Sequence, residues 1–134
     1  MAGALHHVAL TAIDLEASRC WYDACLSVIG YQPGTVDPRI CTWGGITPEV
    51  LLYPVEGADR EPHTHGRPGL QHLAIEVDDR GIVDAAHSAV VQIATGRVVH
   101  PPQEYDYLPS YYAVFVEDPS GNRWEILTTT SAAT

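Results

Sequence analysis

The stretch GLQHLAIEVDD, residues 69–79, decides the fold of this chain. Its alternation of polar and apolar residues predicts a half-buried strand. The apolar residues expected to pack against a helix are Leu73, Ile75 and Val77. His72 then lies on the opposite face, because successive side chains of a strand alternate. Asp79 is placed to cap a following helix, which the Ala/Val-rich sequence extends toward Gly96.

A second copy of this pattern lies near the start of the chain. The segment LHHVAL, residues 5–10, predicts a strand, and Asp14 follows His7 at the spacing that separates Asp79 from His72. A helix through about Ser27 then stops near Gly30. This agreement in strand type, histidine position and cap predicts a duplicated strand–helix unit.

Short β-rich runs follow each helix and suggest roughly three further strands in each half. They are Arg39–Trp43, Val50–Tyr53, Arg97–His100, Tyr111–Val116 and Trp124–Thr128. The turn sequence DPSGN, residues 118–122, predicts that the last two strands form a hairpin. We therefore expect a single α+β domain over residues 1–134, with module one at about 4–57, a linker at about 58–68 and module two at about 69–128.

Composition excludes several classes of partner. Seventeen acidic residues against seven arginines and no lysine give a formal net charge of −10, which repels nucleic acid and anionic membranes. The N-terminus has no signal-peptide pattern, and no window reaches the ~18 apolar residues of a membrane span. We expect a cytoplasmic protein without nucleic-acid or membrane partners. The odd number of cysteines, without C-x-x-C spacing, favours buried free thiols.

Two histidines and one carboxylate form the candidate metal site. His7 and His72 occupy equivalent places in the two copies, and Glu125 lies on the last strand. If the two halves pair their sheets around a common axis, these three side chains converge on one cavity, a set that suits Fe(II), Mn(II) or zinc. Superposing the copies puts Leu51 where a fourth carboxylate would stand. The alternative is two ordinary histidines and a surface carboxylate.

Further residues are candidates for substrate binding or proton transfer. The expected substrate-binding residues are Tyr53, Tyr111, Phe115, Trp43 and Thr11, with Tyr105 and Tyr107 near the rim. Glu76 shares the face of His72 and is a candidate general base beside Glu125, although a carboxylate facing water at the rim is the competing interpretation. Arg39 and Arg67 could orient a substrate carboxylate.

Three segments together resemble the vicinal oxygen chelate superfamily of glyoxalases, bleomycin-resistance proteins and extradiol dioxygenases. They are HHVAL at residues 6–10, the stretch quoted first, and YYAVFVEDPSGNRWEIL at residues 111–127. The resemblance implies paired βαβββ modules forming a U-shaped, cavity-bearing mixed sheet with helices outside. It also implies metal ligands at His7, His72 and Glu125, and a homodimer in which two subunits often share a site.

The resemblance implies a metal-dependent enzyme whose small-molecule substrate chelates the ion through oxygen. Leu51 argues against a four-ligand glyoxalase I site, so a lyase, an isomerase or an extradiol-type dioxygenase stays open, and His100 is a possible acid/base residue for the last. Fe²⁺ or Mn²⁺ is favoured, with Zn²⁺, Ni²⁺ or Co²⁺ possible. The alternative is a drug-binding protein of the bleomycin-resistance type.

Overall fold

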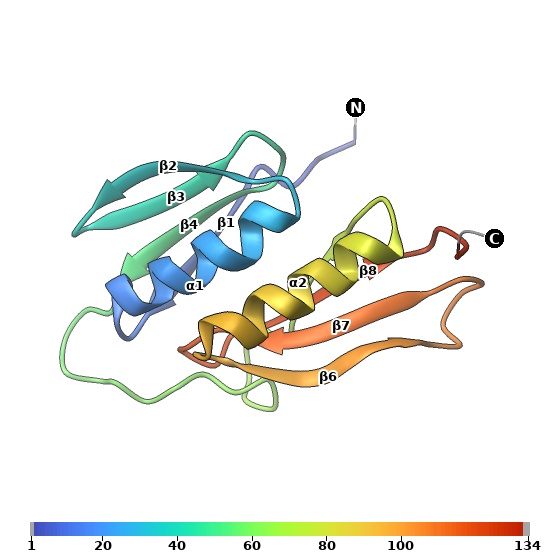
Figure 1. Cartoon of the computed structure of the whole chain (residues 1–134). Coiled ribbons are helices and arrows are strands. Elements are labelled where there is room, and N and C mark those ends of the chain that lie inside the picture. The colour runs from blue at the N-terminus through green and yellow to red at the C-terminus, as the bar shows by residue number, and fades with distance from the viewer. Residues whose placement is uncertain (1, 133–134) are drawn as a thin grey trace.

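The computed structural model describes residues 2–132, which fold as two βαβββ modules (Figure 1). The first contains β1 (His7–Ala12), α1 (Leu15–Val28), β2 (Gln32–Asp37), β3 (Ile40–Gly44) and β4 (Glu49–Pro54). The second contains β5 (Leu73–Glu76), α2 (Arg80–Ile93), β6 (Arg97–Glu104), β7 (Tyr112–Glu117) and β8 (Arg123–Thr128). The α+β class with two such modules is confirmed. No helix among the described residues is long and apolar enough to cross a membrane.

The two modules share one sheet topology. The strand order is β1-β4-β3-β2 in the first sheet and β5-β8-β7-β6 in the second. β1 is parallel to β4 and β5 is parallel to β8, whereas the remaining neighbours are antiparallel. The two halves that the histidine spacing related therefore have the same strand order and the same strand directions.

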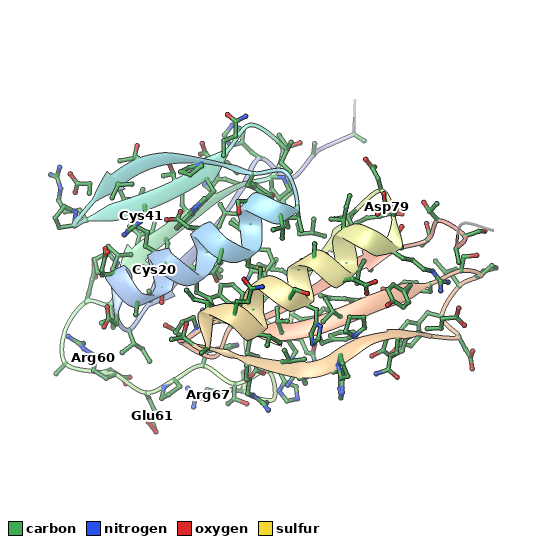
Figure 2. The ribbon with its side chains drawn as sticks, viewed as in Figure 1. Cys20, Cys41, Arg60, Glu61, Arg67 and Asp79 are labelled. Carbon is green, nitrogen blue, oxygen red and sulfur yellow. The ribbon has the colours of Figure 1, made fainter. Side chains whose placement is uncertain are left out.

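Both helices begin at the aspartates that the sequence indicated. The side chain of Asp14 accepts a hydrogen bond from the amide of Ala17 at 3.1 Å, and that of Asp79 accepts one from Ile82 at 3.0 Å. Each carboxylate satisfies an amide that has no partner within the first turn. Figure 2 shows Asp79 at the start of α2.

The two modules are joined through their helices. α1 and α2 run antiparallel and side by side, each over one face of its own sheet (Figure 1). Tyr22 of α1 packs between Trp43 and Trp124, with ring centroids 5.4 and 5.9 Å apart. Its hydroxyl donates to Asp118 at 2.5 Å and accepts from the indole of Trp124 at 3.0 Å. Because these buried groups come from both modules, they hold the modules as one core.

The structure differs from the sequence prediction at the outer strands. β2 was not predicted, because its sequence QPGTVD contains proline and glycine and does not alternate. β6 continues through Pro101 and Pro102 to Glu104, with irregular register. Both are edge strands. An edge strand tolerates proline, because an amide that faces away from the sheet has no hydrogen-bond partner to lose. Cys25 and Cys41 are buried as expected, but Cys20 is exposed on α1.

The linker is held against the second module at His63. Its amide donates to the carbonyl of Ser120 at 2.9 Å, and its ring nitrogen Nε2 lies 2.7 Å from the carbonyl of Leu70. Gly121, in the β7–β8 turn, has a φ of +90° and lies directly beneath the His63 backbone. The linker is therefore an ordered strap between the modules.

Candidate metal and ligand site

His72 and Glu125 meet on the open face of the second sheet. The register pairs Ala74 with Glu125, and His72 lies two residues before Ala74, just before β5 begins at Leu73, so it is the diagonal neighbour of that carboxylate. His72 Nε2 lies 3.1 Å from Glu125 Oε1. Glu125 is only 3% exposed, although its carboxylate borders a cavity. The strand pairing therefore produces two adjacent metal-ligating groups.

Neighbouring side chains orient this pair. Gln71 Oε1 contacts Nδ1 of His72, so a proton on Nδ1 leaves the lone pair of Nε2 facing Glu125 Oε1. Two acceptors at that separation repel each other unless a proton or a cation lies between them. The hydroxyl of Tyr111 donates to the second oxygen, Glu125 Oε2. His72 Nε2 and Glu125 Oε1 are therefore suited to bind a cation at the border of the cavity.

The cavity beside this pair has a volume of about 590 Å³. This volume lies within the range of roughly 300–1,000 Å³ that is usual for small-molecule sites. Most of the remaining lining comes from β6, β7 and the loop between them, whereas Gln71 precedes β5 and Arg123 begins β8. The lining residues are Gln71, His72, His100, Gln103, Tyr105, Tyr107, Tyr111, Phe115, Arg123 and Glu125.

Four aromatic side chains make one side of the cavity, and we call Tyr105, Tyr107, Tyr111 and Phe115 the aromatic wall. The rings of Tyr105 and Tyr107 are stacked, with centroids 5.1 Å apart and an interplanar angle of 7°. Tyr111 and Phe115 stand edge-on to Tyr105 at 6.3 and 5.7 Å. Of the substrate-binding residues expected from the sequence, Tyr111 and Phe115 thus lie beside His72 and Glu125.

The environment of Tyr111 disfavours its ionisation. Burial, followed by the hydrogen bond to Glu125 and the charge of that carboxylate, raises the pKa of Tyr111 well above its usual value. The phenol therefore keeps its proton at neutral pH and acts as a donor to the carboxylate.

His7 lies on the other sheet and does not line this cavity. β1 carries it on the open face of the first module, where it is exposed and contacts His6, with the two Nδ1 atoms 2.9 Å apart. Among residues 2–132, no three His, Cys, Asp or Glu side chains are grouped so that they could hold a metal ion. One chain therefore brings together two of the three expected ligands.

A larger cavity of about 890 Å³ lies between the first module and the linker. Thr11 and Tyr53 line it, and so do Arg39 and Arg67, which the sequence left unplaced. Glu56, Asp59 and Glu61 also line it, so its carboxylates outnumber its arginines. Figure 2 shows Glu61 and Arg67 on the linker. Of the expected substrate-binding residues, Thr11 and Tyr53 thus line the cavity at the first module, and Tyr111 and Phe115 line the cavity at the second.

Two expected site residues lie elsewhere. Trp43 lines neither cavity: it is 1% exposed in the core, and its indole donates to Asp23 at 2.8 Å. Strand alternation sends Trp43 toward α1, whereas its neighbour Thr42 faces the other way. Glu76 is exposed and accepts a hydrogen bond from Thr129 at 2.8 Å, which matches the interpretation as a carboxylate facing water.

The sequence prediction missed Gln71, Gln103 and Arg123 among the cavity residues. Gln71 adjoins His72 in sequence, so a search for groups able to orient the histidine would have found it. Gln103 follows two prolines in an irregular strand, and no periodicity indicated its direction. His100, which the sequence suggested only as a possible acid/base residue of a dioxygenase, does line the cavity.

Two βαβββ modules, each with its first strand parallel to its last, define the glyoxalase type of fold. The chain belongs to the glyoxalase/bleomycin resistance protein/dioxygenase superfamily, whose family model matches residues 4–126.

Individual relatives agree with this assignment. The uncharacterized protein YqjT of Bacillus subtilis is 26% identical over 92% of this chain and 97% of its own length. A candidate glyoxalase from Bacillus halodurans superposes with a TM-score of 0.78 and 28% identity, covering 94% of this chain and 96% of that one. A lactoylglutathione lyase from Agrobacterium tumefaciens superposes with a TM-score of 0.66 and 25% identity, covering 96% and 95%.

Proposed function

We propose that this protein is a metal-dependent enzyme of its superfamily, acting on a small molecule that chelates one divalent ion through oxygen. His72 and Glu125 of one chain and His7 of a second copy would hold the ion. The observation that carries the proposal is the 3.1 Å approach of His72 Nε2 to Glu125 Oε1 at the edge of a cavity. Fe²⁺ or Mn²⁺ suits two imidazoles and one carboxylate best, with Zn²⁺, Ni²⁺ or Co²⁺ as alternatives.

The residues around the pair have separate roles in this proposal. A bound ion would supply Lewis acidity toward a substrate oxygen. Gln71, by accepting a hydrogen bond from His72 Nδ1, would leave the Nε2 lone pair facing Glu125 Oε1 and a bound ion, and the Tyr111 phenol holds the Glu125 carboxylate in place. His100 lines the same cavity and is the proposed proton carrier. Glu76, directed to Thr129 and solvent, is not retained in that role.

A homodimer would complete the ligand set. His7, Ala9 and Thr11 are exposed along one face of β1, and Tyr53 of β4 is 41% exposed beside them. A face of this kind can receive the open face of the second sheet from another copy, and the two-fold arrangement then creates two equivalent sites. Leu51 lies on the same face of the first sheet and offers no donor atom, so the site would have three protein ligands.

A drug-binding protein without catalysis is the second candidate function. The observation that favours it is that Tyr111 already engages Glu125 while no group of three metal-ligating side chains forms within residues 2–132. In that case the aromatic wall would bind the ligand and the protein would take up no ion.

Mixing two variants tests the shared metal site. We would purify His7→Ala and the double variant His72→Ala/Glu125→Gln, exchange their subunits, and measure bound metal by elemental analysis. Each variant alone should bind no metal. A mixed dimer keeps one intact site, so the exchanged sample should bind about a quarter of the metal of the wild type.

A site contained in one chain predicts no recovery on mixing, and that result would exclude the shared arrangement. His65→Ala is the matched control, because His65 lies in the linker, and it should bind metal as the wild type does. Wild-type protein that takes up no ion from any of the five metals would overturn the enzyme proposal in favour of the binding protein.

A further inference from the structure

The cavity beside His72 and Glu125 has a lining that selects its ligand by shape and charge. One side of it is the aromatic wall, in which Tyr105 contacts the other three rings and Tyr107 also contacts Tyr111. Planar rings gain most from offset stacking and edge-on contacts with other rings, so an aromatic wall favours a flat ligand over a saturated one of equal size.

The wall stands on an ordered loop. Between β6 and β7, the amide of Tyr105 donates to the carbonyl of Tyr111 at 3.0 Å and closes the loop at its base. Ser110, with a φ of 62°, turns the chain back just before Tyr111, and its hydroxyl lies 3.1 Å from that of Ser131. A ligand therefore meets the rings of Tyr105, Tyr111 and Phe115 already in place, which lowers the entropic cost of binding.

The charges around the cavity disfavour an anionic ligand. Among the described residues, Arg123 is the only arginine in the lining, and both its Nε and its Nη2 bond to Glu117, at 3.0 and 2.9 Å. The Glu125 carboxylate borders the cavity, and the chain as a whole carries a net charge of −10. The Arg123 guanidinium is thus held by Glu117, which also pairs with Arg97, while the Glu125 carboxylate at the cavity repels a carboxylate or a phosphate.

One polar group in the wall has no structural partner. The hydroxyl of Tyr105 is buried and makes no hydrogen bond within the described residues, whereas the hydroxyl of Tyr111 is engaged by Glu125. A buried hydroxyl without a partner is costly, and such groups usually serve a ligand or a functional role. Tyr107, whose ring stacks on that of Tyr105, is 64% exposed, so its displacement would not disturb the core.

We propose that this cavity binds an uncharged, planar aromatic molecule that carries an oxygen substituent, with its ring against the aromatic wall. The ligand ring displaces the side chain of Tyr107, and the Tyr105 hydroxyl donates a hydrogen bond to the ligand oxygen. The inference rests on the proposed function only in identifying this cavity as the substrate site beside His72 and Glu125.

Four matched probes test the proposal on metal-free wild-type protein by calorimetry or by change in intrinsic fluorescence. They are 2-naphthol, naphthalene without the oxygen, decahydro-2-naphthol without the aromaticity, and 2-naphthoate with a negative charge. We expect 2-naphthol to bind at least about tenfold more tightly than the saturated alcohol and than the naphthoate. Equal binding of the saturated alcohol, tighter binding of the naphthoate, or no binding of 2-naphthol up to its solubility would overturn the proposal.

Single substitutions then test which side chains contact the bound probe. Tyr105→Phe should weaken 2-naphthol about three- to tenfold and leave naphthalene unchanged, because only the hydroxyl is removed. Phe115→Leu should weaken both ligands. Tyr112→Phe is the control, since the hydroxyl of Tyr112 bonds to Asp84 of α2 on the other face of the sheet. Loss of both ligands in Tyr105→Phe, or unchanged 2-naphthol binding in that variant, would contradict the assigned hydrogen bond.

Failure of this proposal is separable from failure of the proposed function. Probe binding needs no metal, and metal uptake needs no probe. Binding of 2-naphthol by protein that takes up no metal would retain the aromatic ligand and reject the metal enzyme, whereas metal uptake without selectivity among the probes would do the reverse.

Discussion

Leu51 and Glu125 occupy the same position in the two sheets. Leu51 of β4 is paired with Ala9 in parallel register, and Glu125 of β8 is paired with Ala74 in the same way. Both Ala9 and Ala74 lie two residues after the strand histidine of their module, His7 or His72. The register thus supports the superposition made from sequence, in which a leucine stands where a symmetric site would have a second carboxylate.

Replacing Leu51 by glutamate should add a fourth ligand to the proposed dimeric site. An additional carboxylate raises the charge and the number of donors, so we expect divalent metal affinity to rise at least about tenfold. Co²⁺ binding followed by visible absorption measures both the affinity and the change in coordination, because band intensity falls as coordination number rises. Tyr53→Glu places a carboxylate two residues further along the same face and serves as the control. Equal gains in both variants would indicate general electrostatic attraction instead of ligation.

Removal of the Tyr111 hydroxyl should weaken metal binding without unfolding the protein. The phenol is the donor that holds Glu125 Oε2, and loss of a hydrogen-bond partner to a ligating group commonly costs 10–100-fold in metal affinity or activity, so we expect about tenfold for Tyr111→Phe. Competition with a coloured chelator measures the affinity, and Tyr112→Phe is the matched control. Unchanged affinity in Tyr111→Phe would show that this hydrogen bond has no part in holding the carboxylate.

Gly121→Ala should detach the linker from the β7–β8 turn. A Cβ at this position would lie 2.0 Å from the carbonyl oxygen of His63, and the φ of +90° is already unfavourable for alanine. We expect a loss of about 2–4 kcal/mol in the free energy of unfolding, measured with urea. Gly57→Ala is the control, since its φ is +72° but nothing lies within 4 Å of its Cβ, and it should lose only about 1 kcal/mol. Similar losses in the two variants would show that the close contact at His63 contributes nothing.

The ion pairs of Glu117 should make stability depend on pH in the acid range. Burial alone would raise the pKa of Glu117, but its hydrogen bonds and ion pairs with Arg97 and Arg123 outweigh burial and hold the pKa below the usual 4.5. Because the folded pKa is lowered, this stabilisation is complete above the unfolded value and is lost as the pH falls through the folded one.

Glu117→Gln should therefore cost about 1–3 kcal/mol at pH 7, and the difference from the wild type should shrink toward zero below about pH 4. Urea unfolding at a series of pH values measures it. Arg97→Gln should cost less than about 1 kcal/mol, because the side chain of Arg97 is 62% exposed and its pair is screened by water. A cost of Glu117→Gln that is the same at pH 7 and pH 3 would assign the effect to packing.

Much of the fold follows from short-range features of the sequence. The alternation in residues 69–79, the caps at Asp14 and Asp79 and the turn at residues 118–122 depend on neighbours in the chain, so the elements, their order and their faces could be predicted. The edge strand β2 could not, because its backbone is held by pairing with β3 and not by any local preference.

The site depended on contacts between distant residues. Sequence symmetry identified His72 as the partner of His7, and the parallel register of β5 with β8 then brought His72 to 3.1 Å from Glu125, the carboxylate expected on the last strand. The position of His7 was decided by the core instead: Tyr22, packed between Trp43 and Trp124, joins the modules through their helices and leaves His7 on a separate sheet. Strand periodicity tells which face a side chain takes, but only the packing of the whole chain decides which faces meet.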